Sequence, residues 1–197
     1  MPVPPLPAQP TLILLAGANG AGKSTLYDIV LGPRTALPFV NADLIQRNEL
    51  RDPDPVASYR AAEIAADRRR AHVKAQESFV METVFSHPSK LEFMREARAA
   101  GYRLVVYHIG VQDADMNVAR VAARVNRKGH PVPEDKIRAR RARGEALIRE
   151  AVRLADLAGV FDNSRAGTPP TRHLWYRNGV ETRREPPLPD WIARLYR

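Results

Sequence analysis

The chain has 197 residues, of which 44% are hydrophobic and 27% are charged, a composition typical of one globular domain and not of a disordered chain. Its net charge of +9 favours anionic partners such as nucleotides, phosphorylated metabolites, nucleic acid or an acidic protein, although solvated helix faces would account for it equally well. The absence of cysteine excludes disulfides, zinc–thiolate sites and cysteine nucleophiles.

The N-terminus is rich in proline, and we expect residues 1–10 to be a disordered lead-in to a single domain over residues 11–197. It lacks the basic start and the long apolar core of a secretion signal. No apolar run is long enough to cross a bilayer. We therefore expect a cytoplasmic protein with no membrane partner.

Apolar runs that predict strands alternate with segments that predict helices along the rest of the chain. Strands are expected at residues 11–16, 39–40, 78–84, 103–111 and 160–161, and helices at residues 23–31, 55–76, 88–100, 114–127 and 134–157. Asn178-Gly179 marks the turn of a small C-terminal hairpin. This alternation implies a parallel sheet with helices on both faces, and a ligand beyond the carboxyl ends of the strands.

A glycine-rich segment directly after the first strand, GANGAGKS over residues 17–24, matches the phosphate-binding pattern G-x-x-x-x-G-K-[ST] at every fixed position. Glycine allows the backbone N–H groups to wrap a phosphate, Lys23 supplies a charge to the β- and γ-phosphates, and the Ser24 hydroxyl is a ligand for Mg²⁺. The alternative is a glycine-rich turn with an incidental lysine, which the position between a strand and a helix disfavours. We assign binding of ATP (or GTP) to Gly17, Ala18, Asn19, Gly20, Ala21, Gly22, Lys23, Ser24 and Thr25.

The loop and the alternation together predict an α/β fold. It is expected to be a three-layer P-loop NTPase of the kinase-like type, with a parallel central sheet, an arginine-rich helical lid and the small C-terminal hairpin.

Acidic residues follow two of the predicted strands and should face the same rim as the loop. Asp43 comes just after the strand at 39–40, where it could orient an acceptor hydroxyl or cap the next helix. Glu82 and Thr83 close the strand at 78–84 and are expected to bind the acceptor. The alternative for Glu82 is a solvated side chain at a point where the strand leaves the sheet.

The helix at 114–127 has an apolar stripe at positions i, i+3, i+4 and i+7, with three arginines on its opposite side. The stripe consists of Val118, Val121, Ala122 and Val125, and the arginines are Arg120, Arg124 and Arg127.

In the helix at 134–157, Arg140 and Arg141 lie three and four positions after Ile137 and should project towards the same inner face. A guanidinium group suits a carboxylate or a phosphate. The two helices are therefore expected to form a lid over the triphosphate. A solvated basic surface is the alternative, and we expect only two or three of these arginines to contact phosphate.

The ordered set of motifs resembles the zeta-toxin-like P-loop kinases over about residues 11–165. The motifs are GANGAGKST, FVNAD, METVFS, RVAARVNRKGHPVPEDKIRARRARG and VFDNS. The resemblance implies an ATP- or GTP-dependent kinase. The best-described members phosphorylate a hydroxyl of UDP-N-acetylglucosamine and are restrained by a small antitoxin protein.

Carried over to this sequence, the resemblance implies that Lys23 and Ser24 handle the triphosphate and the metal, that Asp43 is the catalytic aspartate, and that Glu82 binds the substrate. It also implies phosphate-binding arginines, for which Arg124 and Arg140 are the candidates, with Arg120 and Arg127 as rivals. The chain departs from relatives that carry E-T-T-L-S, because Val84 replaces a threonine. We also find no strand-end aspartate typical of a second Mg²⁺ motif, so the metal is expected to depend on Ser24, water and phosphate oxygens, with Asp43 as a further contact through a water.

These observations favour an ATP-dependent kinase that transfers the γ-phosphoryl group to a hydroxyl of a UDP-amino sugar. Asp43 would accept or orient the hydroxyl proton, while Lys23, Arg124 and Arg140 stabilise the transferring group. One alternative is a polynucleotide or nucleoside kinase, although the sequence lacks the basic–aromatic alternation of single-strand binding and nucleic acid is not the expected partner. A second alternative is a switch domain that hydrolyses ATP without an acceptor.

Overall fold

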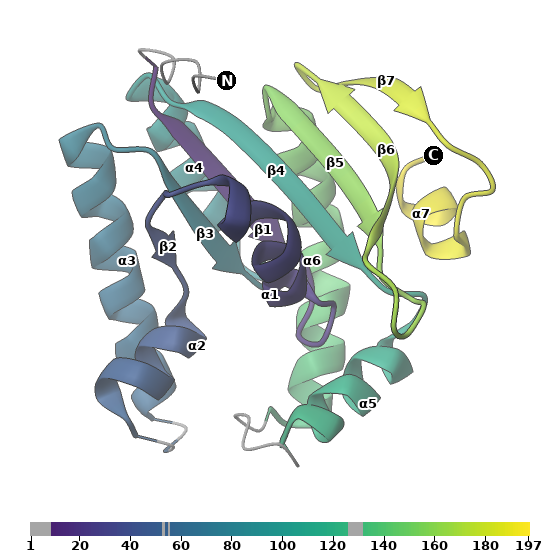
Figure 1. The fold of residues 1–197 in the computed structure, drawn as a ribbon, viewed down its shortest axis with the longest axis horizontal. Coiled ribbons are helices and arrows are strands. Elements are labelled where there is room, and N and C mark those ends of the chain that lie inside the picture. Colours follow the sequence, from purple (N-terminus) through teal and green to yellow (C-terminus); the bar gives the residue numbers. More distant parts are fainter. Residues whose placement is uncertain (1–8, 53, 55, 126–131) are drawn as a thin grey trace.

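Seven strands form one mixed sheet in the computed structural model, which describes residues 9–52, 54, 56–125 and 132–197 (Figure 1). The order across the sheet is β2-β3-β1-β4-β5-β6-β7. The first five strands in this order are parallel, and β6 and β7 are antiparallel. The strands are β1 (Thr11–Ala16), β2 (Phe39–Val40), β3 (Phe79–Thr83), β4 (Arg103–Gly110), β5 (Leu157–Asp162), β6 (Thr171–Arg177) and β7 (Val180–Arg184).

Helical segments connect the parallel strands, and a further helix follows the last strand. They are α1 (Lys23–Leu26), η1 (Tyr27–Leu31), η2 (Gly32–Arg34), α2 (Ala42–Leu44), η3 (Ile45–Leu50), α3 (Ala57–Ala75), α4 (Ser89–Ala99), α5 (Ala114–Val125), α6 (Glu134–Leu154) and α7 (Asp190–Leu195). The predicted helix at 23–31 is α-helical for one turn only and continues as the π-helix η1. No helix in the described ranges combines the length and the apolarity that a membrane span requires.

Two hydrophobic clusters pack on opposite faces of the sheet and give the fold its three layers. On one face, Leu26 and Leu31 from α1 and η1 cover Leu15 of β1. On the other, α3, α4, α6 and α7 pack against strand residues such as Leu14 and Met81. The strand β1 lies at the centre, and its residues Leu12 to Ala16 are almost fully buried because both faces are covered. The predicted three-layer α/β fold is confirmed.

The C-terminal hairpin turns at Asn178-Gly179 as predicted, where both residues have a positive φ. It adds β6 and β7 to the edge of the sheet beside β5. The strand predicted at 160–161 is longer, and the helix before it ends at Leu154. Asp156 then occupies the connection, where its carboxylate accepts a hydrogen bond from Leu104 N at 2.7 Å and ties the start of β5 to β4.

Near the start of the chain, the carbonyl of Pro10 accepts a hydrogen bond from Arg103 N at 2.8 Å. Residues 1–8 of the predicted lead-in lie outside the described residues. At the opposite ends of the strands, the connections from β1 to α1, from β2 to α2 and from β3 to α4 meet at one edge, which α5 faces in Figure 1. This edge carries the predicted site residues.

Candidate active site

The phosphate loop runs from the end of β1 into α1, and two of its glycines have a backbone conformation that other residues rarely adopt. Gly20 has φ +74° and Gly22 has φ +94°. A Cβ atom at Gly22 would lie 2.0 Å from Asn163 Nδ2, and one at Gly20 would lie 2.6 Å from the carbonyl oxygen of Asn117. Both positions therefore require glycine for conformation and for space.

Two buried asparagines brace this loop from outside. Asn117 of α5 donates from Nδ2 to the carbonyl of Asn19 at 2.8 Å. Asn163, directly after β5, donates from Nδ2 to the carbonyl of Ala21 at 2.9 Å. These bonds tie the loop to α5 and to the end of β5. Sequence reasoning did not single out Asn117, because a lone amide in a helix looks like a surface residue.

Glu82, at the end of β3, is the centre of the polar contacts below the loop. Its Oε2 accepts hydrogen bonds from Ser24 Oγ and from Asn41 Nδ2, each at 2.9 Å. Its Oε1 lies 3.5 Å from Lys23 Nζ, and both side chains of this ion pair are at most 10% exposed. Lys23 also donates to the carbonyl of Ala18 at 3.0 Å. Parallel pairing explains the arrangement, because Glu82 sits opposite Leu15, beside the point where β1 enters the loop.

Asn41, and not Asp43, caps the helix that follows β2. The Asn41 side chain accepts hydrogen bonds from Asp43 N at 2.8 Å and from Leu44 N at 3.3 Å. The alternative role considered for Asp43, a helix N-cap, is therefore wrong. Its carboxylate is exposed and lies 3.9 Å from Arg124 Nη1 of α5. The structure thus brings the predicted catalytic acid and a predicted phosphate-binding arginine together.

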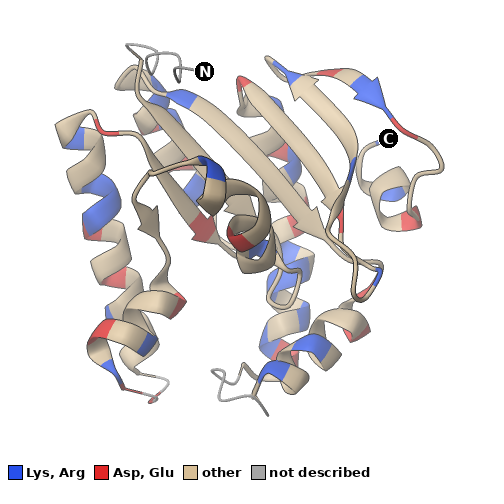
Figure 2. Cartoon of the chain, viewed as in Figure 1, with Lys and Arg blue, Asp and Glu red and all other residues tan. Residues whose placement is uncertain are grey.

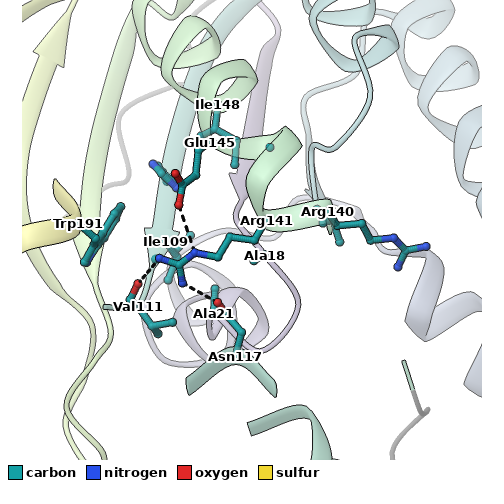
Figure 3. Close-up of a pocket in the computed structure, with 14 residues that line it drawn as sticks. Ala18, Ala21, Ile109, Val111, Asn117, Arg140, Arg141, Glu145, Ile148 and Trp191 are labelled. Carbon is teal, nitrogen blue, oxygen red and sulfur yellow. Dashed lines mark hydrogen bonds and ion pairs between the residues drawn. The ribbon is translucent and has the colours of Figure 1, made fainter. Parts of the chain in front are cut away.

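The other predicted lid arginines differ in their contacts. Arg120 is half-buried and donates to the carbonyl of Ser164 at 3.4 Å. Arg140 is also half-buried, but it makes no hydrogen bond or ion pair with any residue that the structure describes. It points away from its neighbour Arg141 (Figure 3). Arg127 lies outside the described residues.

Arg141 has a structural role, because its guanidinium group forms hydrogen bonds with other groups of the protein (Figure 3). It donates to Asn117 Oδ1 at 2.7 Å and to the carbonyl of Val111 at 3.0 Å, and its Nε lies 3.2 Å from a carboxylate oxygen of Glu145. Arg141 therefore fixes Asn117, which in turn holds the loop at Asn19. The chain Arg141–Asn117–Asn19 links α6, α5 and the phosphate loop.

The buried face of α5 is not the predicted apolar stripe. Asn117 and Val121 are buried, whereas Val118 and Val125 are only half-buried and Ala122 is exposed. The helix is rotated because Asn117 is drawn inward by Arg141 and by the loop carbonyl. Two polar bonds at one position outweigh the small apolar gain that a more regular stripe would provide.

The remaining predicted residues lie on the same edge. Thr25 is exposed on α1. Thr83 accepts a hydrogen bond from Phe85 N through Oγ1 at 3.1 Å, which stabilises the left-handed conformation of Phe85 after β3. Val84 lines a cavity of about 20 Å³ between the loop and α6. A cavity of this size holds about one water molecule and is not a substrate pocket.

The groups around Ser24 suit a hard divalent cation and a triphosphate. Ser24 Oγ and the Glu82 carboxylate are 2.9 Å apart, and both are the oxygen donors that Mg²⁺ prefers. The Lys23 ammonium and the glycine backbone provide the matching positive charge and N–H groups. Among the described residues, no cluster of three or more His, Cys, Asp or Glu side chains could hold a metal by itself.

The sequence matches the family model described as "AAA domain" over residues 12–147, more than half of the chain. An uncharacterized protein of Haemophilus influenzae is 30% identical to it over 143 residues, which are 67% of this chain and 93% of the relative. The family match includes the phosphate loop and the strands beside it.

Solved structures share the fold at low sequence identity. A chain of the AvrRxo1-ORF1:AvrRxo1-ORF2 complex, solved with ATP, has a TM-score of 0.64 and 14% identity; the match covers 90% of this chain and 61% of that one. A chain of the PezAT toxin–antitoxin system of Streptococcus pneumoniae has a TM-score of 0.60 and 13% identity, covering 83% and 72%. The motif, the sheet order and the family match agree, and this chain belongs to the AAA domain family with a P-loop fold of the kinase-like type.

Proposed function

We propose that this chain is an ATP-dependent kinase of the zeta-toxin type. The observation that carries the proposal is the approach of Asp43 to Arg124 at 3.9 Å, on the edge where the phosphate loop ends. An acid from the β2 side and a cation from the lid come together there. A hydrolytic switch would need no acid on the acceptor side.

The donor side is formed by Lys23, Ser24 and Glu82. Lys23 is paired with Glu82 and bonded to the carbonyl of Ala18. These contacts hold the ammonium at the loop, ready to exchange a carbonyl partner for a phosphate oxygen. Ser24 and Glu82 would hold Mg²⁺, which when bound neutralises charge on the β- and γ-phosphates. Glu82 thereby supplies the strand-end carboxylate that the sequence search for an aspartate did not find.

The acceptor side is formed by Asp43. Its pair with Arg124 is long and largely exposed, with side-chain exposures of 57% and 43%, so it contributes little to stability. A weak pair of this kind is easily exchanged when an acceptor hydroxyl and a phosphoryl group arrive. Asp43 would then take the hydroxyl proton, while Arg124 and Arg140 stabilise the charge on the transferring group.

The acceptor that we propose is a UDP-amino sugar such as UDP-N-acetylglucosamine, and the partner protein a small antitoxin. Both follow from the resemblance to zeta toxins, which the fold shared with a chain of the PezAT toxin–antitoxin system supports. The basic charge of +9 suits an anionic sugar nucleotide. We further propose that the reaction takes place in the cytoplasm.

The test is phosphoryl transfer from labelled ATP to a panel of sugar nucleotides and nucleosides. Asp43→Asn should lower kcat by at least about a hundredfold without weakening ATP binding, because only the acceptor proton loses its base. Lys23→Ala should lower activity to a similar extent and also weaken ATP binding.

The matched control is Asp28→Asn, which changes an exposed carboxylate on η1. It should keep wild-type activity. Full activity in Asp43→Asn would contradict the mechanism. Transfer to nucleosides or oligonucleotides alone would replace the sugar-nucleotide assignment and keep the kinase.

A further inference from the structure

Arg69 of α3 is a buried cation that no acidic side chain of the described residues neutralises. It is the last member of the buried stripe Ala57, Ala61, Ala65 and Arg69, and the whole residue is only 8% exposed. Its guanidinium lies over the ring of Phe93 of α4, at 5.8 Å from the ring centre. It makes no hydrogen bond or ion pair with any residue in the described part of the chain. A cation–π contact alone offsets only part of the cost of removing a guanidinium from water.

A second cation lies beside it. Lys90 is in the first turn of α4, three positions before Phe93, so both side chains share one face of that helix. Lys90 is half-buried and forms no ion pair with a described residue. Burial, and secondarily the charge of Arg69, lower the pKa of Lys90. Burial likewise lowers the pKa of Arg69, with a smaller effect of the neighbouring Arg70.

The neighbours of Arg69 on α3 differ from it because they form ion pairs. Figure 2 shows a basic band on α3, in which Arg68 pairs with Glu49 and Arg70 pairs with Asp67 at the surface. Arg69 lies between them and is buried, yet it has no ion pair with any of the residues that the structure describes. Two adjacent unpaired cations require an anion of more than one negative charge or several acceptor oxygens. A phosphoryl group meets this need, since the arginine fork binds two of its oxygens and the lysine adds a point charge.

We propose that Arg69 and Lys90 form a second phosphoryl-binding site, at the seam between α3 and α4 and separate from the phosphate loop. The two helices of this seam follow the segments that carry Asp43 and Glu82, which places the site on the acceptor half of the molecule. The phosphoryl group belongs either to the acceptor itself, in which case the inference rests on the proposed kinase function, or to a free phosphate ion.

The first experiment measures binding of inorganic phosphate by calorimetry in the Lys23→Ala variant, which weakens the contribution of the phosphate loop. Replacing Arg69 by methionine (Arg69→Met) or Lys90 by methionine (Lys90→Met) in that background should weaken phosphate binding at least about tenfold. The matched control Arg70→Met, which removes an exposed neighbouring cation, should leave the affinity unchanged. Wild-type-like phosphate affinity in both Arg69→Met and Lys90→Met would overturn the site.

Melting temperatures provide a readout that a merely structural role would not produce. Without phosphate, Arg69→Met should melt at the same temperature as wild type or higher, because an uncompensated buried charge is replaced by an apolar chain. Phosphate should raise the melting temperature of wild type more than that of Arg69→Met. An equal rise in both proteins would contradict the proposal. If Arg69→Met does not fold, Lys90→Met, at a less buried position, carries the same comparison.

Steady-state kinetics distinguish a phosphoryl group of the acceptor from a free phosphate ion. If it belongs to the acceptor, Arg69→Met raises KM for phosphorylated acceptors at least about tenfold and leaves kcat and the KM for ATP near wild type. If it is free phosphate, the acceptor KM is unchanged while phosphate affinity falls. The calorimetric result stands whether or not sugar nucleotides are phosphorylated, so failure of the kinase proposal and failure of this site are distinguishable.

Discussion

Glu82 lies where the proposed metal site and the proposed acceptor side meet. Its carboxylate contacts Ser24, Asn41 and Lys23 within one small volume. A carboxylate is needed there because all three partners are donors and Lys23 is a buried cation. An amide could accept from one partner, but its NH₂ group would face a second donor.

Glu82→Gln should therefore lower phosphoryl transfer at least about a hundredfold and raise the Mg²⁺ concentration needed for half-maximal rate. The physical reason is that the amide carries no charge to balance Lys23 or to bind the metal. The measurement is a Mg²⁺ titration of turnover at saturating ATP. Glu92→Gln, at an exposed position of α4, is the control. A wild-type Mg²⁺ dependence in Glu82→Gln would show that the carboxylate does not serve the metal.

Two adjacent arginines of α6, Arg140 and Arg141, differ in their contacts, and the proposed mechanism gives a catalytic role only to Arg140. Arg141 is bonded to α5 and to the end of β4, whereas Arg140 has no partner among the described residues (Figure 3). Successive residues on a helix point about 100° apart, so one can brace the lid while the next faces a ligand. Figure 2 shows basic residues on both α5 and α6. Only the contacts distinguish which of them hold the lid.

Alanine substitutions at Arg140 and Arg141 should affect different properties, turnover for the first and stability for the second. Arg140→Ala should lower turnover by about tenfold or more and change the free energy of unfolding by less than about 0.5 kcal/mol. Arg141→Ala should lower the free energy of unfolding by about 1–3 kcal/mol, because Asn117 and the carbonyl of Val111 lose their partner. Urea unfolding and steady-state kinetics on both variants check this. A stability loss confined to Arg140→Ala would contradict the assignment.

Across the whole molecule, the C-terminal helix α7 is attached to the centre of the sheet through a buried histidine. His108 of β4 shares a hydrogen bond with Tyr196 Oη at 2.6 Å and packs against Trp191 with ring centres 5.2 Å apart. Trp191 also donates to Asp162 at 2.7 Å. Burial, with a smaller contribution from the charge of Arg141, lowers the pKa of His108 to about 3.

This pKa predicts a loss of stability in acid. Below about pH 6.5 the unfolded chain protonates His108, while the folded chain keeps it neutral down to about pH 3. The contribution of neutral His108 to the free energy of unfolding is therefore complete above pH 6.5. It decreases as the pH falls, by about 2 kcal/mol between pH 7 and pH 5. His108→Gln should flatten this part of the pH dependence of the unfolding free energy, measured by urea unfolding. His87→Gln, at an exposed position, is the control. An unchanged slope in His108→Gln would refute the assignment.

Local patterns in the sequence were sufficient for the elements and for the phosphate loop. Short apolar runs, a glycine-rich turn and the Asn178-Gly179 dipeptide each encode a conformation through nearest neighbours, so the sequence alone predicts them. The stripe on α5 was wrong for the opposite reason. Asn117 is buried through partners 24 and 98 positions away in the chain, Arg141 and Asn19, which no helical period reveals.

The sequence by itself determined that a phosphate loop follows a buried strand in a kinase-like α/β fold, and that acids and arginines follow it along the chain. Only the tertiary structure decided their pairing. Parallel strand register places Glu82 under Lys23 and Ser24, and the packing of α5 places Arg124 beside Asp43. It also buries Arg69 over the ring of Phe93, without an ion pair to any residue in the described part of the chain. Local propensity acts between neighbours in the chain, whereas a charge is paired or left unpaired by residues that the fold brings together from far apart.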